Sequence, residues 1–343
     1  ESNLTRGYMV NYAMNYMGFD SMAIGNHEFD WTDAWLRKNA NLSYNGVKTP
    51  LISANIVKKG TNETPDFLSK STIVERGDYK IGIVGSIGDQ LKGTILASCV
   101  EDYNFTNELE AVNSEAAKLK NVEKCDIVLL TSHNDIELIN SGLTNVDAVF
   151  GGHAHIGKTI EIGGTIPAVQ TENYGKSIGH IQLKIDKSTK EVSTSTYELD
   201  SSPLNLSGLA KDNNVTNIMN NYTSEISKIK DIELGSCDSE LRNDGALKGV
   251  CVESMYQGAL AGIKSLNLGI AESDILATFH NVNGGIRSNI EKGKITYGDV
   301  YSPFPFDNEI VLYKLTGKKF LNNVSEYSTL ACRRTFEKRA DID

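Results

Sequence analysis

The chain has 343 residues, of which 40% are hydrophobic and 23% charged, so it is globular in composition and long enough for two domains of ordinary size. Its net charge of -10 at pH 7 argues against binding of duplex nucleic acid through a basic face, and no apolar run approaches the ~20 residues that a membrane span requires. Any anionic substrate must therefore be attracted by local cations, either metal ions or a few arginines.

The first predicted elements lead into a stretch rich in polar chemistry. Apolar residues at helical spacing predict a helix over residues 5–17, and a short apolar run predicts a buried strand over residues 20–24. The sequence Gly25-Asn-His-Glu-Phe-Asp30 follows at once and contains an amide, an imidazole and two carboxylates. Because ligands of open α/β sheets bind at the carboxyl ends of strands, we expect Asn26 and His27 to lie at such a site.

The middle of the chain alternates between strands and helices. The pattern predicts strands over residues 51–56, 79–84, 126–131 and 146–150, an amphipathic helix over residues 107–120, and further strands near Pro167 and Ile178. Alternation of this kind predicts a layered α/β domain that ends near Leu199.

Two of these predicted strands also end in imidazole groups. The strand over residues 126–131 runs into Ser132-His133, and the strand over residues 146–150 runs into Gly151-Gly-His153-Ala-His155. If these strands and the one before Asn26 share a sheet, the groups meet at one edge, and on an extended segment His153 and His155 point to the same side. Imidazole, amide and carboxylate groups together suit zinc, manganese or iron; the alternative is a set of unrelated loop residues.

The second half of the chain begins after a turn-rich break at residues 201–205. A periodic polar segment over residues 209–230 predicts a linking helix, and a second domain follows from about Glu233, with a helix over residues 252–263 and a strand over residues 274–279. The glycine-rich turn that follows ends in Arg287, whose guanidinium can bind an oxyanion through two hydrogen bonds. Without that arginine, such a turn is most often structural.

The order of these motifs resembles the calcineurin-like metallophosphoesterases. The segments Asn283-Gly-Gly-Ile-Arg287 and Pro305-Phe-Asp-Asn308 are similar to those of the 5'-nucleotidase branch, and the resemblance runs from about Asn11 to about Phe320. It implies cleavage of nucleoside monophosphates to nucleoside and phosphate at a centre of two divalent ions, such as zinc or manganese. The expected partner is a nucleotide rather than a nucleic acid.

The resemblance also implies an architecture. We expect a four-layer α/β/β/α metallophosphoesterase domain over residues 1–200, a linking helix over residues 201–232, and a smaller, incomplete α/β nucleotidase C-terminal domain over residues 233–343.

Roles for the metal and catalytic residues follow from the same resemblance. One ion would be held by Asn26, His133 and His153, and His155 would belong to the other. His27 would stabilise the phosphoryl oxygens or protonate the leaving group, with Asp30 orienting its imidazole.

Substrate contacts are expected from the second domain. The resemblance places Arg287 on the substrate and Phe306 in a stack against the nucleobase, which tolerates different bases. The turn formed by Asn283, Gly284 and Gly285 would lie beside them, and Arg242 matches a second substrate arginine. The family asparagine falls on Val282, so that either Asn281 or Asn283 takes its part.

Parts of the family pattern are not found in these residues. An opening strand with Asp-x-His and a Gly-Asp ahead of Asn26, whose carboxylate bridges the two ions, are missing, as is a second base-stacking aromatic at the other end. We therefore expect a chain truncated at both ends and nearly inactive as it stands. The alternatives are a non-catalytic descendant that binds nucleotide or metal, and an esterase of diphosphates, cyclic nucleotides or sugar phosphates.

Two features favour an extracellular or periplasmic, secreted glycoprotein. The acceptor motif Asn-x-Ser/Thr begins at Asn3, Asn41, Asn62, Asn104, Asn205, Asn214, Asn221 and Asn323. Cys237 and Cys251 bracket a polar loop and could be bridged, as in oxidising compartments, or could be two free thiols. The chain begins at Glu1 rather than Met, and we expect a mature form or a fragment.

Overall fold

The computed structural model describes residues 4–200, 210–275, 277–281, 285–306, 308–320 and 330–332. The chain divides into two compact units, Glu1–Tyr222 and Thr223–Asp343, and the division falls inside the helix α4 (Asn213–Lys230). Each unit is described by itself.

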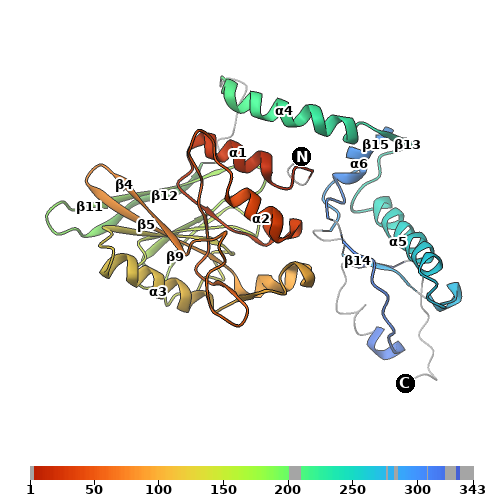
Figure 1. Ribbon diagram of the computed structural model, residues 1–343, viewed down its shortest axis with the longest axis horizontal. Coiled ribbons are helices and arrows are strands. Elements are labelled where there is room, and N and C mark those ends of the chain that lie inside the picture. Colours follow the sequence, from red (N-terminus) through yellow and green to blue (C-terminus); the bar gives the residue numbers. More distant parts are fainter. Residues whose placement is uncertain are drawn as a thin grey trace. The chain divides into compact units, whose positions relative to one another are not determined.

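The first unit is a mixed α/β structure (Figure 1). Its helices are α1 (Tyr8–Met17), α2 (Thr32–Ala40) and α3 (Glu108–Asn121), with short 3-10 helices η1 (Asn26–Trp31), η2 (Asp89–Thr94) and η3 (Ala97–Cys99). Its strands are β1 (Met22–Ala23), β2 (Leu51–Ile52), β3 (Ile56–Lys58), β4 (Ser71–Arg76), β5 (Tyr79–Ile87), β6 (Tyr103–Phe105), β7 (Ile127–His133), β8 (Ala148–Gly151), β9 (Lys158–Ile162), β10 (Ile166–Gln170), β11 (Ile178–Ile185) and β12 (Val192–Asp200).

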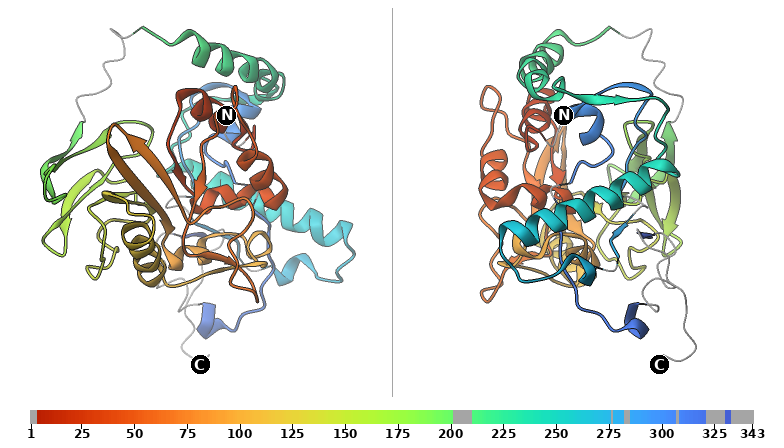
Figure 2. Two further views of the ribbon diagram at one scale, coloured as in Figure 1. Left: turned by 60° about the vertical axis from the view of Figure 1, so that its left-hand side comes forward. Right: turned by 90° about the vertical axis from the view of Figure 1, so that its right-hand side faces the viewer.

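A six-stranded sheet in the order β4-β5-β7-β8-β10-β9 forms the centre of this unit. The strands β5, β7, β8 and β10 are mutually parallel, whereas β4 and β9 pair antiparallel at the edges. The helix α3 lies along one face of the sheet (Figures 1 and 2) and buries Val112, Ala116 and Leu119 against the central strands. The strands β11 and β12 form a separate two-stranded sheet, as do β3 and β6.

The strand before Asn26 lies beside this sheet rather than in it, which corrects the expectation of one shared sheet. The strand β1 pairs with β2 in a two-stranded parallel sheet of its own. This pair approaches β5 closely because Gly85 has no side chain: a Cβ there would lie 2.5 Å from the backbone oxygen of Ile52. The contact places the end of β1 next to the end of β5.

Most predicted elements of the first unit are confirmed, among them α1, α3, β7 and β8. The single strand predicted over residues 51–56 is wrong, because β2 and β3 are separate. Between them Asn55, which is fully buried, bonds through its side chain to the backbone of Ile87 and to Thr106 O. These side-chain bonds take the place of strand pairing at Asn55, so that β2 ends before it and β3 begins after it.

The second unit contains the C-terminal part of α4, a long helix and two short antiparallel ladders (Figure 2). Its elements are β13 (Glu233–Cys237), α5 (Ala246–Ser265), η5 (Glu272–Asp274), β14 (Phe279–Asn281), β15 (Gly293–Thr296), α6 (Tyr297–Tyr301) and β16 (Leu330–Cys332). β13 pairs with β15, and β14 pairs with β16. The helix α5 supplies Leu247 and Cys251 to the core of this unit.

Two expectations for this unit change. The strand predicted over residues 274–279 is wrong, because Asp274 Oδ2 accepts a hydrogen bond from Ala271 N at 3.1 Å and caps the turn η5, so that the strand begins only at Phe279. Of the two alternatives for the cysteines, the structure has free thiols, and Cys237 Sγ donates a hydrogen bond to Glu291 O at 3.2 Å. In the described residues, no helix combines the length and apolar character needed to cross a membrane.

Candidate metal centre and anion site

Three predicted metal ligands converge at the carboxyl end of β7. Asn26 Oδ1 lies 3.0 Å from His133 Nε2, and His153 Nδ1 lies 3.3 Å from the same nitrogen. Ligand atoms about 2.1 Å from one tetrahedral ion are separated by roughly 3 to 3.5 Å, so this spacing is that of a ligand set. Asn26 begins η1, His133 ends β7, and His153 follows β8, so three separate strands position the cluster.

The amide of Asn26 is oriented with its oxygen toward the imidazoles. Its Nδ2 donates to Thr94 Oγ1 at 3.2 Å, and that hydroxyl in turn donates to Leu91 O at 2.7 Å. Because Thr94 Oγ1 is thereby an acceptor for the amide, Oδ1 is the atom that faces His133. Thr94 was not predicted from the sequence, since a lone threonine gives no signal.

The close approach of His133 to this loop depends on Gly25. A Cβ at Gly25 would lie 2.7 Å from His133 Cε1 and 2.8 Å from its Nδ1. The backbone N–H of Gly25 also donates to Glu28 Oε2 at 2.7 Å, which closes the turn that presents Asn26. Burial raises the pKa of the Glu28 carboxyl, although the hydrogen bond from Gly25 and the nearby His27 act against that rise.

Both imidazoles of the cluster are held in the neutral form. Burial, and to a smaller extent the neighbouring imidazoles of His153, His27 and His155, lower the pKa of His133 to about 3. Burial and the neighbouring His155 and His27 also lower the pKa of His153. A neutral imidazole is the form that binds a metal ion.

The segment that carries His153 and His155 is not extended. Both residues have left-handed backbone conformations, with φ of 66° and 60°, so the expectation that they point to one side of an extended segment is wrong. The hydrogen bond from Ala154 N to Gly152 O at 2.7 Å holds the tight turn that produces this geometry. His155 is exposed, and it lies near enough to lower the pKa of His133 and His153.

His27 stands beside the cluster and is oriented by a carboxylate. His27 Nδ1 lies 2.8 Å from Asp30 Oδ2, and both side chains are partly exposed. Donation from Nδ1 to Asp30 fixes the tautomer and directs Nε2 away from that carboxylate.

The donor set fits one divalent ion with neutral ligands. Within the described part of the chain, no three His, Cys, Asp or Glu side chains are arranged to hold a metal ion, and the third member of the cluster is an amide oxygen instead. Carboxylates of neighbouring segments have other partners: Glu28 accepts from Gly25 N, Asp30 contacts His27, and Asp135 is paired with Lys158.

In the second unit, two predicted substrate residues lie together. The guanidinium carbon of Arg287 lies 5.0 Å from the centroid of the Phe306 ring, a cation–π arrangement. Arg287 Nε and Ser288 Oγ are buried and have no hydrogen-bond partner among the described atoms. Because buried donors normally have partners, this pair marks a place where an acceptor such as an oxyanion fits.

The remaining predicted substrate residues are less informative. Arg242 is exposed and forms a two-bond contact with Asp244, with nitrogen–oxygen distances of 2.9 and 2.8 Å, which raises the pKa of the guanidinium. Gly285 is described, whereas Asn283 and Gly284 lie outside the described residues.

Known proteins are similar to this chain in sequence and in fold. Residues 271–335 match the family described as 5'-nucleotidase, C-terminal domain. The chain is 27% identical over 364 residues to the 5'-nucleotidase of Bos taurus, covering 94% of this chain and 60% of that protein. It is 27% identical over 330 residues to the Endonuclease YhcR of Bacillus subtilis (strain 168), and the match covers 89% of this chain and 26% of that protein.

The fold is similar to that of the 5'-nucleotidase precursor from Thermus thermophilus. The TM-score is 0.74 at 20% sequence identity, and the match covers 96% of this chain and 68% of that one. The resemblance inferred from the motifs and the mixed α/β class are thus confirmed. The chain spans less than two thirds of the length of the two curated relatives.

Proposed function

Because this chain is related to the 5'-nucleotidases in sequence and has their fold, we propose that it hydrolyses phosphate esters of nucleotides, releasing nucleoside and phosphate from nucleoside monophosphates. The observation that supports this most is the convergence of Asn26, His133 and His153 on one point, with His27 beside them.

The metal-binding residues we propose are Asn26, His133 and His153 for one divalent ion and His155 for a second. Such ions would supply Lewis-acid stabilisation of the phosphoryl oxygens. The side chains provide the preorganisation: burial keeps His133 neutral, and Thr94 directs the amide oxygen of Asn26 inward. These three groups are therefore already close together without an ion.

His27 is the proposed catalytic residue. Its Nδ1 donates to Asp30, so that Nε2 can hold or donate a proton at the phosphoryl group or the leaving oxygen. Asp30 acts by orienting the ring.

The nucleotide-binding residues we propose lie in the second unit. Phe306 offers an aromatic face for the base, where stacking contributes ~1 to 3 kcal/mol. The buried donors of Arg287 and Ser288 can satisfy an anionic or hydroxyl group of the substrate. Asn283, Gly284, Gly285 and Arg242 complete the proposed set, within a C-terminal domain that we place at residues 233–343.

A non-catalytic binder is the second candidate, and the neutral character of the cluster favours it. Two divalent cations held close together repel unless anionic ligands intervene, and a shared carboxylate commonly holds them ~3.5 to 4 Å apart. Asn26, His133 and His153 offer no negative charge, and on this second candidate one ion is bound per chain and no phosphate is released.

We also propose that the protein acts outside the cytoplasm, as a glycoprotein. Of the acceptor asparagines in the described residues, Asn41, Asn62, Asn214 and Asn221 are exposed and Asn104 is half-buried, which supports their modification. A mass shift after enzymatic deglycosylation of protein from its native source is the expected result.

Phosphate release from AMP in Mn²⁺, beside equilibrium binding of AMP, tests the proposed function. We expect release that is abolished by a chelator and by His133→Ala. Binding of AMP and metal without any release identifies the non-catalytic binder, and release that survives His133→Ala contradicts the site.

A further inference from the structure

The carboxylate of Glu108 forms hydrogen bonds with residues at the ends of β5 and β7, next to the proposed metal ligand His133. Alternate residues of β7 face opposite sides, so Ser132, which is buried with Leu130 on the α3 face, points away from His133. Glu108, the first residue of α3, accepts hydrogen bonds at Oε1 from Ser132 Oγ and from Ser86 Oγ of β5, both at 2.6 Å.

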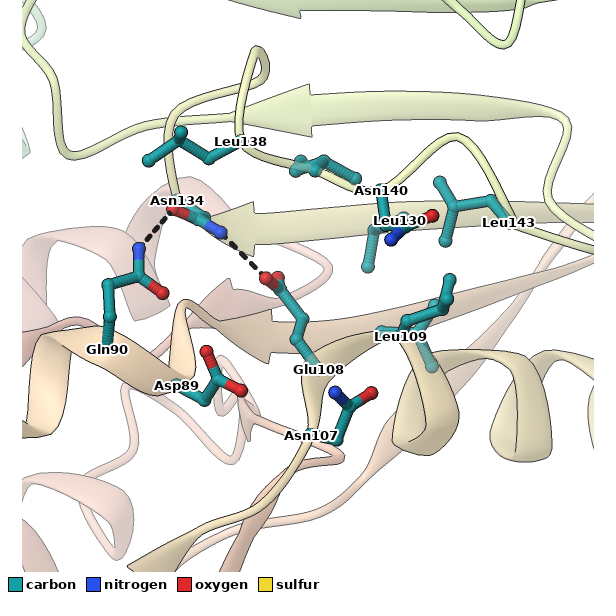
Figure 3. Close-up of a pocket in the computed structure, with 12 residues that line it drawn as sticks. Asp89, Gln90, Asn107, Glu108, Leu109, Leu130, Asn134, Leu138, Asn140 and Leu143 are labelled. Atoms are coloured by element: carbon teal, nitrogen blue, oxygen red, sulfur yellow. Dashed lines mark hydrogen bonds between the residues drawn. The ribbon is translucent and has the colours of Figure 1, made fainter.

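The other oxygen of Glu108 binds the residue that follows His133. Asn134 Nδ2 donates to Glu108 Oε2 at 2.7 Å, and Asn134 Oδ1 accepts from Gln90 Nε2 at 3.0 Å (Figure 3). Ser86, Ser132 and Asn134 are at most 3% exposed, so water does not compete for these bonds. Glu108 therefore holds the residues on both sides of His133.

The network continues to the third metal ligand. The carbonyl oxygen of Asn134 accepts a hydrogen bond from Gly152 N at 2.9 Å, directly before His153, and Gly88 N lies 3.3 Å from His133 O. Ser86 and Ser132 stand opposite each other in the parallel register of β5 and β7. One carboxylate thus links β5, β7 and the turn after β8.

The carboxylate of Glu108 accepts hydrogen bonds from neutral donors. Glu108, Asn134 and Gln90 line a cavity of about 190 Å³ whose lining includes Asp89 but no lysine or arginine (Figure 3). Hydrogen bonds from neutral donors to an ionised acceptor are shorter and stronger than those between neutral groups. Because a carboxylate only accepts, it also fixes the direction of the hydrogen bonds: Gln90 donates to Asn134, and Asn134 donates to Glu108.

We propose that Glu108 is a positioning residue for His133 and His153, an inference that rests on the proposed function in naming these two as metal ligands. It is not one of the proposed metal ligands or substrate residues. It acts by holding Ser132 and Asn134, and hence the imidazole between them, in the arrangement that a divalent ion needs.

The direction of the hydrogen bonds provides a rescue test. In Glu108→Gln, the new NH₂ group faces either the NH₂ group of Asn134 or the two serine hydroxyls, and in both orientations the network loses one acceptor oxygen. Adding Asn134→Asp restores an acceptor there, which can also still accept from Gln90, and leaves the total charge as in the wild type. The pair of changes therefore rebuilds the network with its polarity exchanged.

Glu115→Gln is the matched control. Glu115 also lies on α3 and is buried, and its Oε1 accepts from Ser71 Oγ at 2.6 Å and from Lys118 Nζ at 3.1 Å, away from the end of β7. This variant loses a buried carboxylate of the same helix without touching the residues that flank His133.

The readouts are the imidazole ¹³Cε1–¹H NMR signals of the metal-free chain and its Mn²⁺ affinity by calorimetry. We expect E108Q to shift the signals of His133 and His153 and to weaken Mn²⁺ binding by ~10- to 100-fold. E108Q/N134D should restore both, and E115Q should lower Tm while leaving both unchanged. If E108Q does not fold, Ser132→Ala removes one donor to Glu108 and should shift the same signals.

Unchanged imidazole signals in E108Q, or a double variant that restores neither readout, would overturn the positioning role. Failure of the wild-type chain to bind Mn²⁺ contradicts the proposed function instead. The imidazole signals of the metal-free variants still decide the role of Glu108 in that case.

Discussion

At the residue scale, the state of His133 links the site to stability. Burial and neighbouring imidazoles lower the pKa of His133 from its usual 6.5 to about 3, so the folded protein keeps it neutral while the unfolded chain takes up a proton below pH 6.5. Stability contributed by this group is therefore complete above pH 6.5 and is lost as the pH falls toward 3.

With a chelator present, we predict that the unfolding free energy falls between pH 7 and pH 4. His133 should contribute up to roughly 1.4 kcal/mol per pH unit to this fall. Urea denaturation at several pH values measures it. His133→Gln should flatten the slope, whereas His180→Gln, which changes an exposed histidine, should leave it unchanged. An unaltered slope in His133→Gln contradicts the burial of a neutral imidazole.

Gly25 provides a second residue-scale test. Its φ of -108° is accessible to alanine, so the effect of Gly25→Ala comes only from the added Cβ, which would lie 2.7 Å from His133 Cε1. We expect a loss of ~1 to 3 kcal/mol in stability and weaker metal binding, because the ring or the loop must move. Gly93→Ala, where nothing lies within 4 Å of the new atom, is the control. Equal metal affinity in both variants would show that the loop adapts freely.

At the element scale, the sequence predicts the helices and strands that have a periodic pattern of apolar residues. The helix α3 follows from its amphipathic pattern, and β7 follows from its β-branched and leucine run. The break between β2 and β3 could not be predicted, because it depends on bonds from Asn55 to residues that are distant in the chain. The turn at His153 could not be predicted either, because Gly152 N, just before it, donates to Asn134 O, which is distant in the chain.

Asn55→Ala tests that explanation of the break. The substitution leaves the buried Ile87 N–H and the carbonyls of Ile87 and Thr106 without their side-chain partner. We predict a loss of ~1 to 3 kcal/mol in unfolding free energy, measured by urea denaturation. A loss below ~0.5 kcal/mol would show that the backbone groups find other partners.

At the scale of the whole molecule, the ligands of the candidate metal centre come from the first unit and the proposed nucleotide residues from the second. The identities of these residues could be predicted from motifs, whereas the proximity of Arg287 to Phe306 and of Asn26 to His133 needed the fold. Thr94 and Glu108 were missed, because each acts through a hydrogen bond to a partner rather than through a motif, and the bond from Gly25 N to Glu28 also needed the fold.

Phe306→Ala tests the division of labour between the units. If Phe306 stacks on the base, the variant should raise KM for AMP by ~5- to 100-fold, equivalent to ~1 to 3 kcal/mol, and leave hydrolysis of an aryl phosphate nearly unchanged. Steady-state kinetics with both substrates measures it. Equal losses with both substrates would assign Phe306 to the core of the second unit instead.

The most direct measurement is a calorimetric titration of the purified chain, freed of metal, with Mn²⁺ or Zn²⁺. We predict saturable binding that Asn26→Ala and His153→Ala each weaken by at least ~10-fold, because each removes one of three ligands. His27→Ala should bind metal as the wild type does and reduce only kcat, by ~10² to 10⁴. No saturable binding by the wild-type chain, or wild-type affinity in His153→Ala, would contradict the metal centre at the end of β7.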